Sequence, residues 1–200
     1  MPASIRPKNT DRSLYQKKIE QLYHYYMAHG FDHSVEMIAA GMGISTKTFF
    51  NRYHSKEYSL KLTFDLWMKI LAKRIRERLA DCNNAVEKLV LFMTEVEAIA
   101  AERTPFYQFA VEHHLMTDVK APFTKIVIEI LQEGKQHYQV WESLDSASFS
   151  DFFLFNVFNY VIDRKFDGNL IRYLLVPAMN DRGVELMDFV ISSLETHNLF

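Results

Sequence analysis

Apolar side chains recur at every third or fourth position along most of the chain, and this periodicity limits the fold more than any other feature. Residues 14–29 carry one such stripe, and residues 56–80 carry a longer one that includes Leu60, Trp67 and Leu79. This spacing puts the side chains on one face of an α-helix. The alternation that marks strands is weak throughout, and only 6 Gly and 5 Pro interrupt 200 residues. The sequence therefore predicts an all-α protein of about nine helices.

Several classes of protein do not fit the composition. Cys82 is the only cysteine, so no intramolecular disulfide can form, which favours a reducing compartment. Residues 1–13 lack the apolar segment of a secretory signal. No apolar run approaches the roughly 20 residues that span a bilayer. With 48% hydrophobic and 24% charged residues, the chain is too apolar for disorder. We expect a folded cytoplasmic protein that does not enter a membrane.

Residues 34–60, with the sequence SVEMIAAGMGISTKTFFNRYHSKEYSL, have the pattern of two short helices joined by a tight turn. Ser34 stands where a helix N-cap is favoured. Gly43 allows the positive φ of a sharp turn, and Ala39 offers a small side chain where the helices cross. Phe49 supplies an apolar residue for the inner face of the second helix. The segment predicts a helix-turn-helix, whose second helix can reach base edges and phosphates in a major groove.

The same segment resembles a known family. A helix that ends in Gly-Phe, followed by Ser-Val-x-x-Ile-Ala, Gly-Ile-Ser, Thr-Phe-Phe-x-x-Tyr and Ser-Lys-Glu, is similar to the tetracycline-repressor-like (TetR) family of transcriptional regulators. The resemblance covers residues 19–60. It implies that residues 1–60 form an N-terminal arm and a three-helix DNA-binding domain. Residues 61–200 are then a larger helical ligand-binding and dimerisation domain, and a helix over residues 56–80 connects the two.

The resemblance also assigns DNA contacts to eight positions, which are Ser34, Ser45, Thr46, Lys47, Phe50, Asn51, Arg52 and Lys56. Lys56 matches a lysine that lies near phosphate at the start of the fourth helix. Phe50 stands where the family usually has Tyr, so a phosphate contact through the hydroxyl is missing, although ring packing on a sugar remains open. Phe49 and Tyr53 fit the core better than a DNA-facing role. His54 replaces a frequent Pro.

For the C-terminal domain, the resemblance implies a small-molecule pocket. Such pockets are mostly apolar with a few polar groups. The candidates are Phe92, Val96, Ile99, Phe106, Phe109, His113, Ile126, Ile130, His137 and Phe155, each of which also fits an ordinary core position. Because the interior is rich in aromatic residues and Met, we expect a small apolar or aromatic effector rather than a highly charged one.

The resemblance further implies that two helices, expected near residues 148–162 and 181–196, pair with the same helices of a second subunit. Aromatic residues cover more than one face of the first of these helices, more than a lone subunit could hide. The candidate interface residues are Phe152, Phe153, Val157, Phe158, Met187, Val190, Ile191 and Leu194. We expect a homodimer whose twofold symmetry matches a palindromic operator in double-stranded DNA.

The net charge of −2 conceals an uneven distribution. Residues 1–80 carry 14 Lys and Arg against 7 Asp and Glu, a net charge of +7, whereas residues 81–200 carry 9 against 18, a net charge of −9. The positive part coincides with the helix-turn-helix, where attraction to phosphate is needed. The later basic residues of the helix over 56–80 are expected to form a solvated face, too far along the helix to reach the duplex.

Together these features predict a DNA-binding repressor whose operator binding is modulated by an effector in the C-terminal domain. The alternative is a dimeric ligand-binding module of the same fold that has lost sequence-specific DNA binding, and the missing hydroxyl at Phe50 supports it. The sequence contains no nucleophile motif, no Cys pair or His-x-x-x-His spacing for zinc and no glycine-rich phosphate loop. An enzyme, a metal and a cofactor are therefore not expected.

Overall fold

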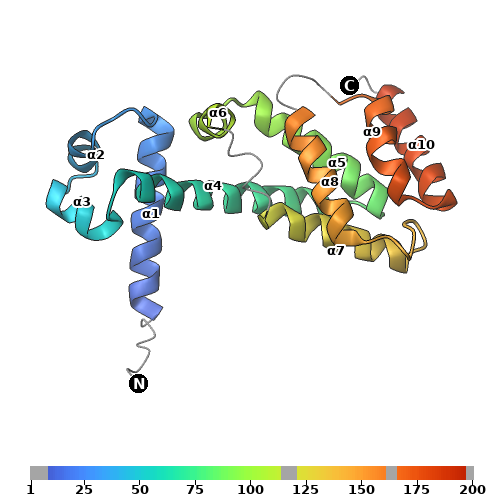
Figure 1. Ribbon diagram of the computed structural model, residues 1–200, viewed down its shortest axis with the longest axis horizontal. Helices are drawn as coiled ribbons and strands as arrows, with labels where there is room; N and C mark the ends of the chain where they lie inside the picture. The colour runs from blue at the N-terminus through green and yellow to red at the C-terminus, as the bar shows by residue number, and fades with distance from the viewer. Residues whose placement is uncertain (1–8, 114–120, 161–165, 197–200) are drawn as a thin grey trace. The chain divides into compact units, whose positions relative to one another are not determined.

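A computed structural model of the chain describes residues 9–113, 121–160 and 166–196. The described backbone is helical apart from its connections and one isolated antiparallel bridge, between Val140 and Met179 (Figure 1). In chain order the helices are α1 (Asn9–His29), α2 (Val35–Gly41), α3 (Thr46–Tyr53), α4 (Lys56–Leu79), α5 (Ala85–Ala101), α6 (Pro105–Glu112), α7 (Ala121–Gln136), α8 (Ser146–Tyr160), α9 (Gly168–Leu175), the 3-10 helix η2 (Val176–Ala178) and α10 (Asp181–Thr196). The prediction of an all-α fold is confirmed.

The chain divides into two compact units, and their boundary differs from the expected one. Unit 1 comprises Met1–Ile70 together with Thr104–Phe106, and unit 2 comprises Leu71–Arg103 and Tyr107–Phe200. The boundary therefore falls inside α4 rather than after residue 60. Trp67 is almost fully buried in unit 1, so the first four turns of α4 complete the core of that unit.

Unit 1 is built on three helices and the first part of α4. Leu22 and Tyr26 of α1 are fully buried, as are Ile38 of α2 and Phe49 of α3. Gly30 ends α1 in a left-handed conformation, with φ of 73°, which glycine adopts without steric cost. The helix itself begins at Asn9, several residues before the expected start.

Phe106 belongs to the core of unit 1, which corrects its predicted place in a ligand pocket of the C-terminal domain. Its ring stacks on Tyr23 at a centroid distance of 5.2 Å and on Trp67 at 5.9 Å. Phe31 meets the same ring edge-on at 5.0 Å. A residue more than 30 positions after Trp67 thus completes this core, and no local sequence pattern predicts such a contact.

Unit 2 is organised around α5, against which α7, α8 and α10 all pack. Its core is aromatic. Phe92 of α5 meets Phe123 of α7 at 6.0 Å and Phe153 of α8 at 5.8 Å, and Phe123 meets Phe158 at 5.3 Å. All four rings are buried. Buried aromatic rings in edge and tilted contact stabilise a core beyond the effect of their area.

The ends of the helices follow ordinary capping chemistry. Asn84 accepts a hydrogen bond from the Glu87 N–H at 2.9 Å to begin α5. Asn180 caps α10, because its Oδ1 accepts a hydrogen bond from the Gly183 N–H at 3.1 Å. Helix α9 was not expected from the sequence, and Asp167 caps it by accepting from the Leu170 N–H. The polar run of residues 163–168 indicates a loop. Residues 163–165 lie outside the described residues, and Gly168 already begins α9.

Membrane-spanning helices and metal-binding clusters are both absent from residues 9–113, 121–160 and 166–196. No helix there is both long and apolar enough to cross a membrane. No group of three or more His, Cys, Asp or Glu residues in those ranges is placed to hold a metal ion.

Candidate nucleic-acid interface

The turn between α2 and α3 has the geometry that the sequence predicts. Ser34 caps α2, and its Oγ accepts a hydrogen bond from the Met37 N–H at 3.4 Å. Gly43 has φ of 66°, and nothing lies within 4 Å of the place where a Cβ would stand. Glycine is therefore required at position 43 by the positive φ of the backbone and not by a lack of space for a side chain. The Ile44 N–H then donates to the Ala39 carbonyl at 2.9 Å, which closes the turn.

Helix α3 separates a buried face from an exposed one. Ser45 caps the helix, because its Oγ accepts from the Thr48 N–H at 3.1 Å, and the two hydroxyls lie 2.9 Å apart. Phe49 and Tyr53 are fully buried, which confirms that they belong to the core. The side chains of Lys47, Phe50 and Asn51 are exposed, and those of Thr46 and Arg52 are half-buried. Of the eight predicted DNA contacts, five therefore lie on this one short helix, which Ser45 precedes.

The connection from α3 to α4 explains why His54 replaces a proline. His54 has φ of 59° and ψ of −48°, and the Ser55 N–H donates to the Tyr53 carbonyl at 2.6 Å. This is a γ-turn of the rarer type, in which φ is positive. Proline, whose ring holds φ near −65°, cannot adopt it. Ser55 then caps α4 by accepting a hydrogen bond from the Tyr58 N–H, and Lys56 begins the helix half-buried.

Two buried hydroxyls fasten α1 to α4 behind the turn. Tyr26 Oη lies 2.8 Å from Ser59 Oγ, and Ser59 Oγ donates to the Lys56 carbonyl at 2.6 Å. Both side chains are fully buried. Tyr53 of α3 adds a third tie, because its hydroxyl donates to the Lys18 carbonyl of α1 at 3.0 Å. These bonds hold the position of α3 relative to α1 and α4.

Burial raises the pKa of Tyr26 to about 12, although its hydrogen bond with Ser59 acts in the opposite direction. The phenol of the unfolded chain ionises near 10, so its contribution to stability is complete below pH 10 and is lost as the pH rises toward 12. We expect the free energy of unfolding to fall across that interval. Absorbance at 295 nm follows the ionisation of Tyr26, and urea unfolding at each pH gives the free energy of unfolding. Both are compared with the values for Tyr26→Phe. A Tyr26 that titrates near pH 10 in the folded protein would contradict the expectation.

The basic residues of unit 1 are available to an external anion. Among the described residues, Lys17, Lys18, Lys47, Arg52 and Lys56 make no ion pair, and neither do Lys61 and Lys69 farther along α4. Unpaired cations are what a surface that binds phosphates needs.

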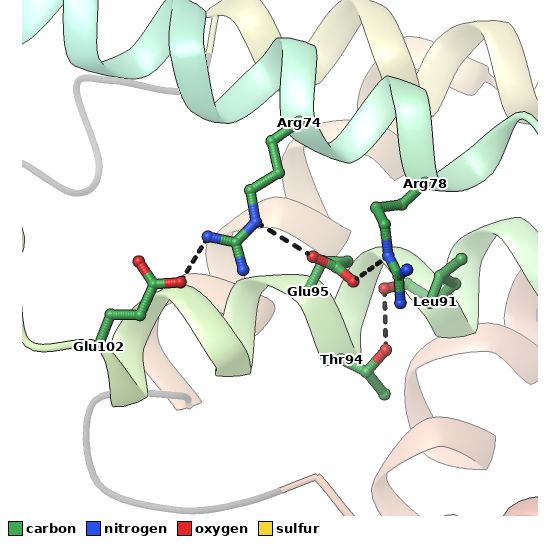
Figure 2. Close-up of polar contacts among 6 residues, drawn as sticks. All are labelled: Arg74, Arg78, Leu91, Thr94, Glu95 and Glu102. Carbon is green, nitrogen blue, oxygen red and sulfur yellow. Dashed lines mark hydrogen bonds and ion pairs between the residues drawn. The ribbon is translucent and has the colours of Figure 1, made fainter.

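The basic residues of unit 2 at the end of α4 differ in this respect. Figure 2 shows Arg74 and Arg78 pointing toward Glu95 of α5, with Arg74 also reaching Glu102. The Arg78 Nε donates to the nearly buried Glu95 carboxylate at 2.9 Å. Arg76 is paired with Glu129. Carboxylates of the same unit therefore offset these charges, and these arginines are paired rather than simply solvated.

One cluster near the interface was not predicted. Tyr25 Oη lies 2.6 Å from His33 Nδ1, and the His29 ring stands 4.7 Å from Tyr25 and 5.7 Å from His33. A Cβ at Gly41 would lie 2.3 Å from the Tyr25 ring, so the ring occupies the space that a side chain there would fill. The cluster fastens the end of α1 to α2. No local sequence pattern indicates this cluster, because its residues meet only through the path of the loop between α1 and α2.

Known proteins were compared at the levels of sequence and fold. Neither a protein-family model nor a curated protein matches the sequence. Solved structures do match the fold. RolR in complex with resorcinol superposes with a TM-score of 0.67 at 12% identity, over 90% of this chain and 95% of that chain. The regulator FadR from Bacillus subtilis in complex with stearoyl-CoA gives 0.59 at 20% identity, over 81% and 96%. A putative TetR-family regulator from Vibrio parahaemolyticus gives 0.56 at 12% identity, over 83% and 98%.

The chain has the TetR fold. The likeness extends over four fifths or more of the chain in each case, so it includes much of unit 2, where the sequence itself resembles the family only in length and helical pattern.

Within this TetR fold, the predicted pocket residues fall into three groups. Phe92, Val96, Ile99, Ile126 and Ile130 are buried in unit 2. Phe109 is half-buried, and its ring lies 4.2 Å from that of His113, which is exposed. His137 and Phe155 are also exposed. The structure thus brings five of the ten candidates into one core and leaves the exposed three on the surface of unit 2.

The predicted interface residues also separate by burial. Phe153, Val157, Phe158, Met187 and Ile191 are buried within the single chain, so they belong to the core and offer a partner no surface, which corrects their assignment. Phe152 is exposed, and Val190 and Leu194 are half-buried. Phe155 of α8 and Phe189 of α10 are two further exposed rings on the same two helices. Helical periodicity alone does not reveal which of two apolar faces a helix buries.

Proposed function

We propose that this chain is a dimeric transcriptional repressor that binds operator DNA through α3 and responds to an apolar effector bound in unit 2. The observation that carries the proposal is a set of Lys and Arg residues on and beside the polar outer face of α3 that make no ion pair with any described carboxylate. A helix that presents such groups can contact base edges and phosphates at once.

In this proposal the eight sequence-assigned residues act in two groups. Thr46, Lys47, Phe50 and Asn51 face the bases from α3, while the others approach the backbone, namely Ser34, Ser45, Arg52 and Lys56. Lys47, Phe50 and Asn51 are exposed on α3, whereas Lys56 is half-buried at the first turn of α4. Phosphate contacts fix the register of the protein on the duplex, and base contacts supply the sequence preference.

The proposed dimer uses the apolar face formed by Phe152, Phe155, Phe189, Val190 and Leu194. Helices α8 and α10 both pack on α5, so one element supports both halves of this face. An isologous interface buries the same residues of each copy. Twofold symmetry would present two copies of α3 to two half-sites about one helical turn apart, or a multiple of one turn.

The proposed effector is small and apolar or aromatic. Aromatic rings make up much of the core of unit 2. Among proteins with the TetR fold, RolR has been solved with resorcinol and FadR with stearoyl-CoA. Both ligands have apolar parts that suit such an interior. An effector can release the operator only through different affinities for the DNA-bound and free arrangements of the protein.

Lys47→Ala is expected to lower operator affinity by roughly tenfold, because the ammonium group would no longer donate to a base edge in each half-site. The reason is that Lys47 is exposed on α3 and has no carboxylate partner among the described residues. Full-length protein is first used to select fragments from genomic DNA, and binding of the selected duplex is then measured over a range of salt concentrations.

Lys125→Ala is the matched control, because Lys125 is an exposed lysine of unit 2 that pairs with Glu129. It should leave affinity unchanged. A wild-type protein that retains no duplex, at low salt and without effector, would overturn the proposal and favour a ligand-binding module that does not read DNA.

A further inference from the structure

Phe50 is the one large apolar side chain on the otherwise polar outer face of α3, within the part of the helix that the structure describes. Its exposed fraction is 44%, whereas its neighbour Phe49 and the following Tyr53 are fully buried. The ring of Phe50 meets that of Phe49 edge-on, at a centroid distance of 6.0 Å and an angle of 88°. The ring is therefore supported on one side by the core and remains open to a ligand on the other.

The residues beside Phe50 limit what that ligand can be. Thr46 and Lys47 precede it by four and three positions, so they share its face of α3. Lys47 is exposed, and no carboxylate of the described chain pairs with it. A lone phenyl ring next to an uncompensated ammonium group suits a polyanion that also carries a small apolar group. It does not suit an extended apolar partner.

Double-stranded DNA offers such a group in one place. In the major groove each base pair presents donors and acceptors, and the C5 methyl of thymine is the only apolar feature. A phenyl ring has no donor or acceptor, so it cannot bind a phosphate or a polar base edge. A tyrosine at this position could do so through its hydroxyl.

We propose that Phe50 reads the C5 methyl of a thymine in each half-site of the operator. This inference rests on the proposed function and adds to it a base preference. Each half-site then contains thymine at the position that faces Phe50, and Lys47 contacts the duplex beside it. The ring packs on the base and not on the sugar-phosphate backbone, which would give no preference among bases.

The test removes only the methyl group. Full-length protein selects its site from random duplexes, and each thymine of that site is then replaced in turn by deoxyuridine. We expect one position in each half-site to respond, with affinity falling about fourfold for one half-site and about 15-fold for both, as the loss of one buried methyl group predicts.

Variants at Phe50 test whether the loss of affinity on replacing thymine by deoxyuridine depends on the Phe50 ring. With Phe50→Ala, the difference between thymine and deoxyuridine should vanish at the responsive position, and with Phe50→Leu part of it should remain. Lys47→Ala serves as the comparison, because it should weaken binding to both duplexes equally. Phe50 is exposed, so these variants should fold, and circular dichroism checks this.

Three results would overturn the inference. A scan in which no deoxyuridine alters affinity would place the ring away from any methyl group. A response that persists unchanged in Phe50→Ala would assign the methyl contact to another residue. In both cases the protein still selects a duplex, so the proposed function stands. If the wild-type protein selects no duplex at all, both the proposed function and this inference are wrong.

Discussion

Phe189→Glu is expected to convert the protein from a dimer into a monomer. Phe189 has 72% of its side chain exposed on α10, so the single chain gains nothing from this ring. In the proposed interface, each copy would instead bury a carboxylate among apolar side chains, which is costly without a partner. Because a twofold interface contains the substitution twice, we expect the dissociation constant of the dimer to rise by at least about 100-fold. Sedimentation velocity over a range of concentrations measures this.

The same substitution should also weaken operator binding, because two half-sites bind more tightly when one dimer links them. Tyr173→Glu is the matched control. Tyr173 is a ring on α9 with a similar exposed fraction of 67%, but it lies outside the proposed interface. That variant should remain dimeric. If both variants dimerise as the wild-type protein does, the interface lies elsewhere on the molecule.

Gly183→Ala is expected to destabilise unit 2 by about 3 kcal/mol, although alanine favours helix formation over glycine by about 1 kcal/mol. A Cβ at Gly183 would stand 2.1 Å from the Gln139 carbonyl oxygen and 3.0 Å from Met179. The carbonyl cannot easily move away, because it accepts a hydrogen bond from the Asn180 N–H at 3.2 Å. The Gln139 side chain is also held, since its Oε1 accepts from the Ala85 N–H at the start of α5.

Urea unfolding followed by circular dichroism measures this loss. Gly43→Ala provides the contrast, because nothing lies within 4 Å of the added Cβ and the only cost is that of φ at 66°. That cost is about 1 to 2 kcal/mol. A Gly183→Ala variant as stable as the wild-type protein would mean that α10 does not approach Gln139 so closely.

Features that depend on neighbours in the chain were predicted correctly. Gly43 has positive φ and Ser34 caps α2, as the sequence predicts. A cap or a turn involves bonds that span only three or four residues, so the residue types at those positions are sufficient to indicate it. The inner face of α3 was predicted for the same reason.

Features that depend on packing were predicted in part or wrongly. The aromatic residues of α8 indicated a helix, but not that Phe153 and Phe158 face the core while Phe152 and Phe155 face solvent. Asn180 caps α10, although the neighbouring Asp181 is an equally good capping residue, so residue type alone does not indicate which of the two acts.

By itself, the sequence determined the all-helical fold, the turn between α2 and α3 and the division of charge between the two parts of the chain, because these follow from local spacing and composition. Only the tertiary structure decided that the boundary of unit 1 falls within α4 and that Phe106 completes the core of that unit. It also decided that the described basic side chains of unit 1 make no ion pair, whereas arginines at the end of α4 do. Each of these depends on side chains that lie far apart in the chain and meet only when the helices pack, so local sequence patterns do not encode them.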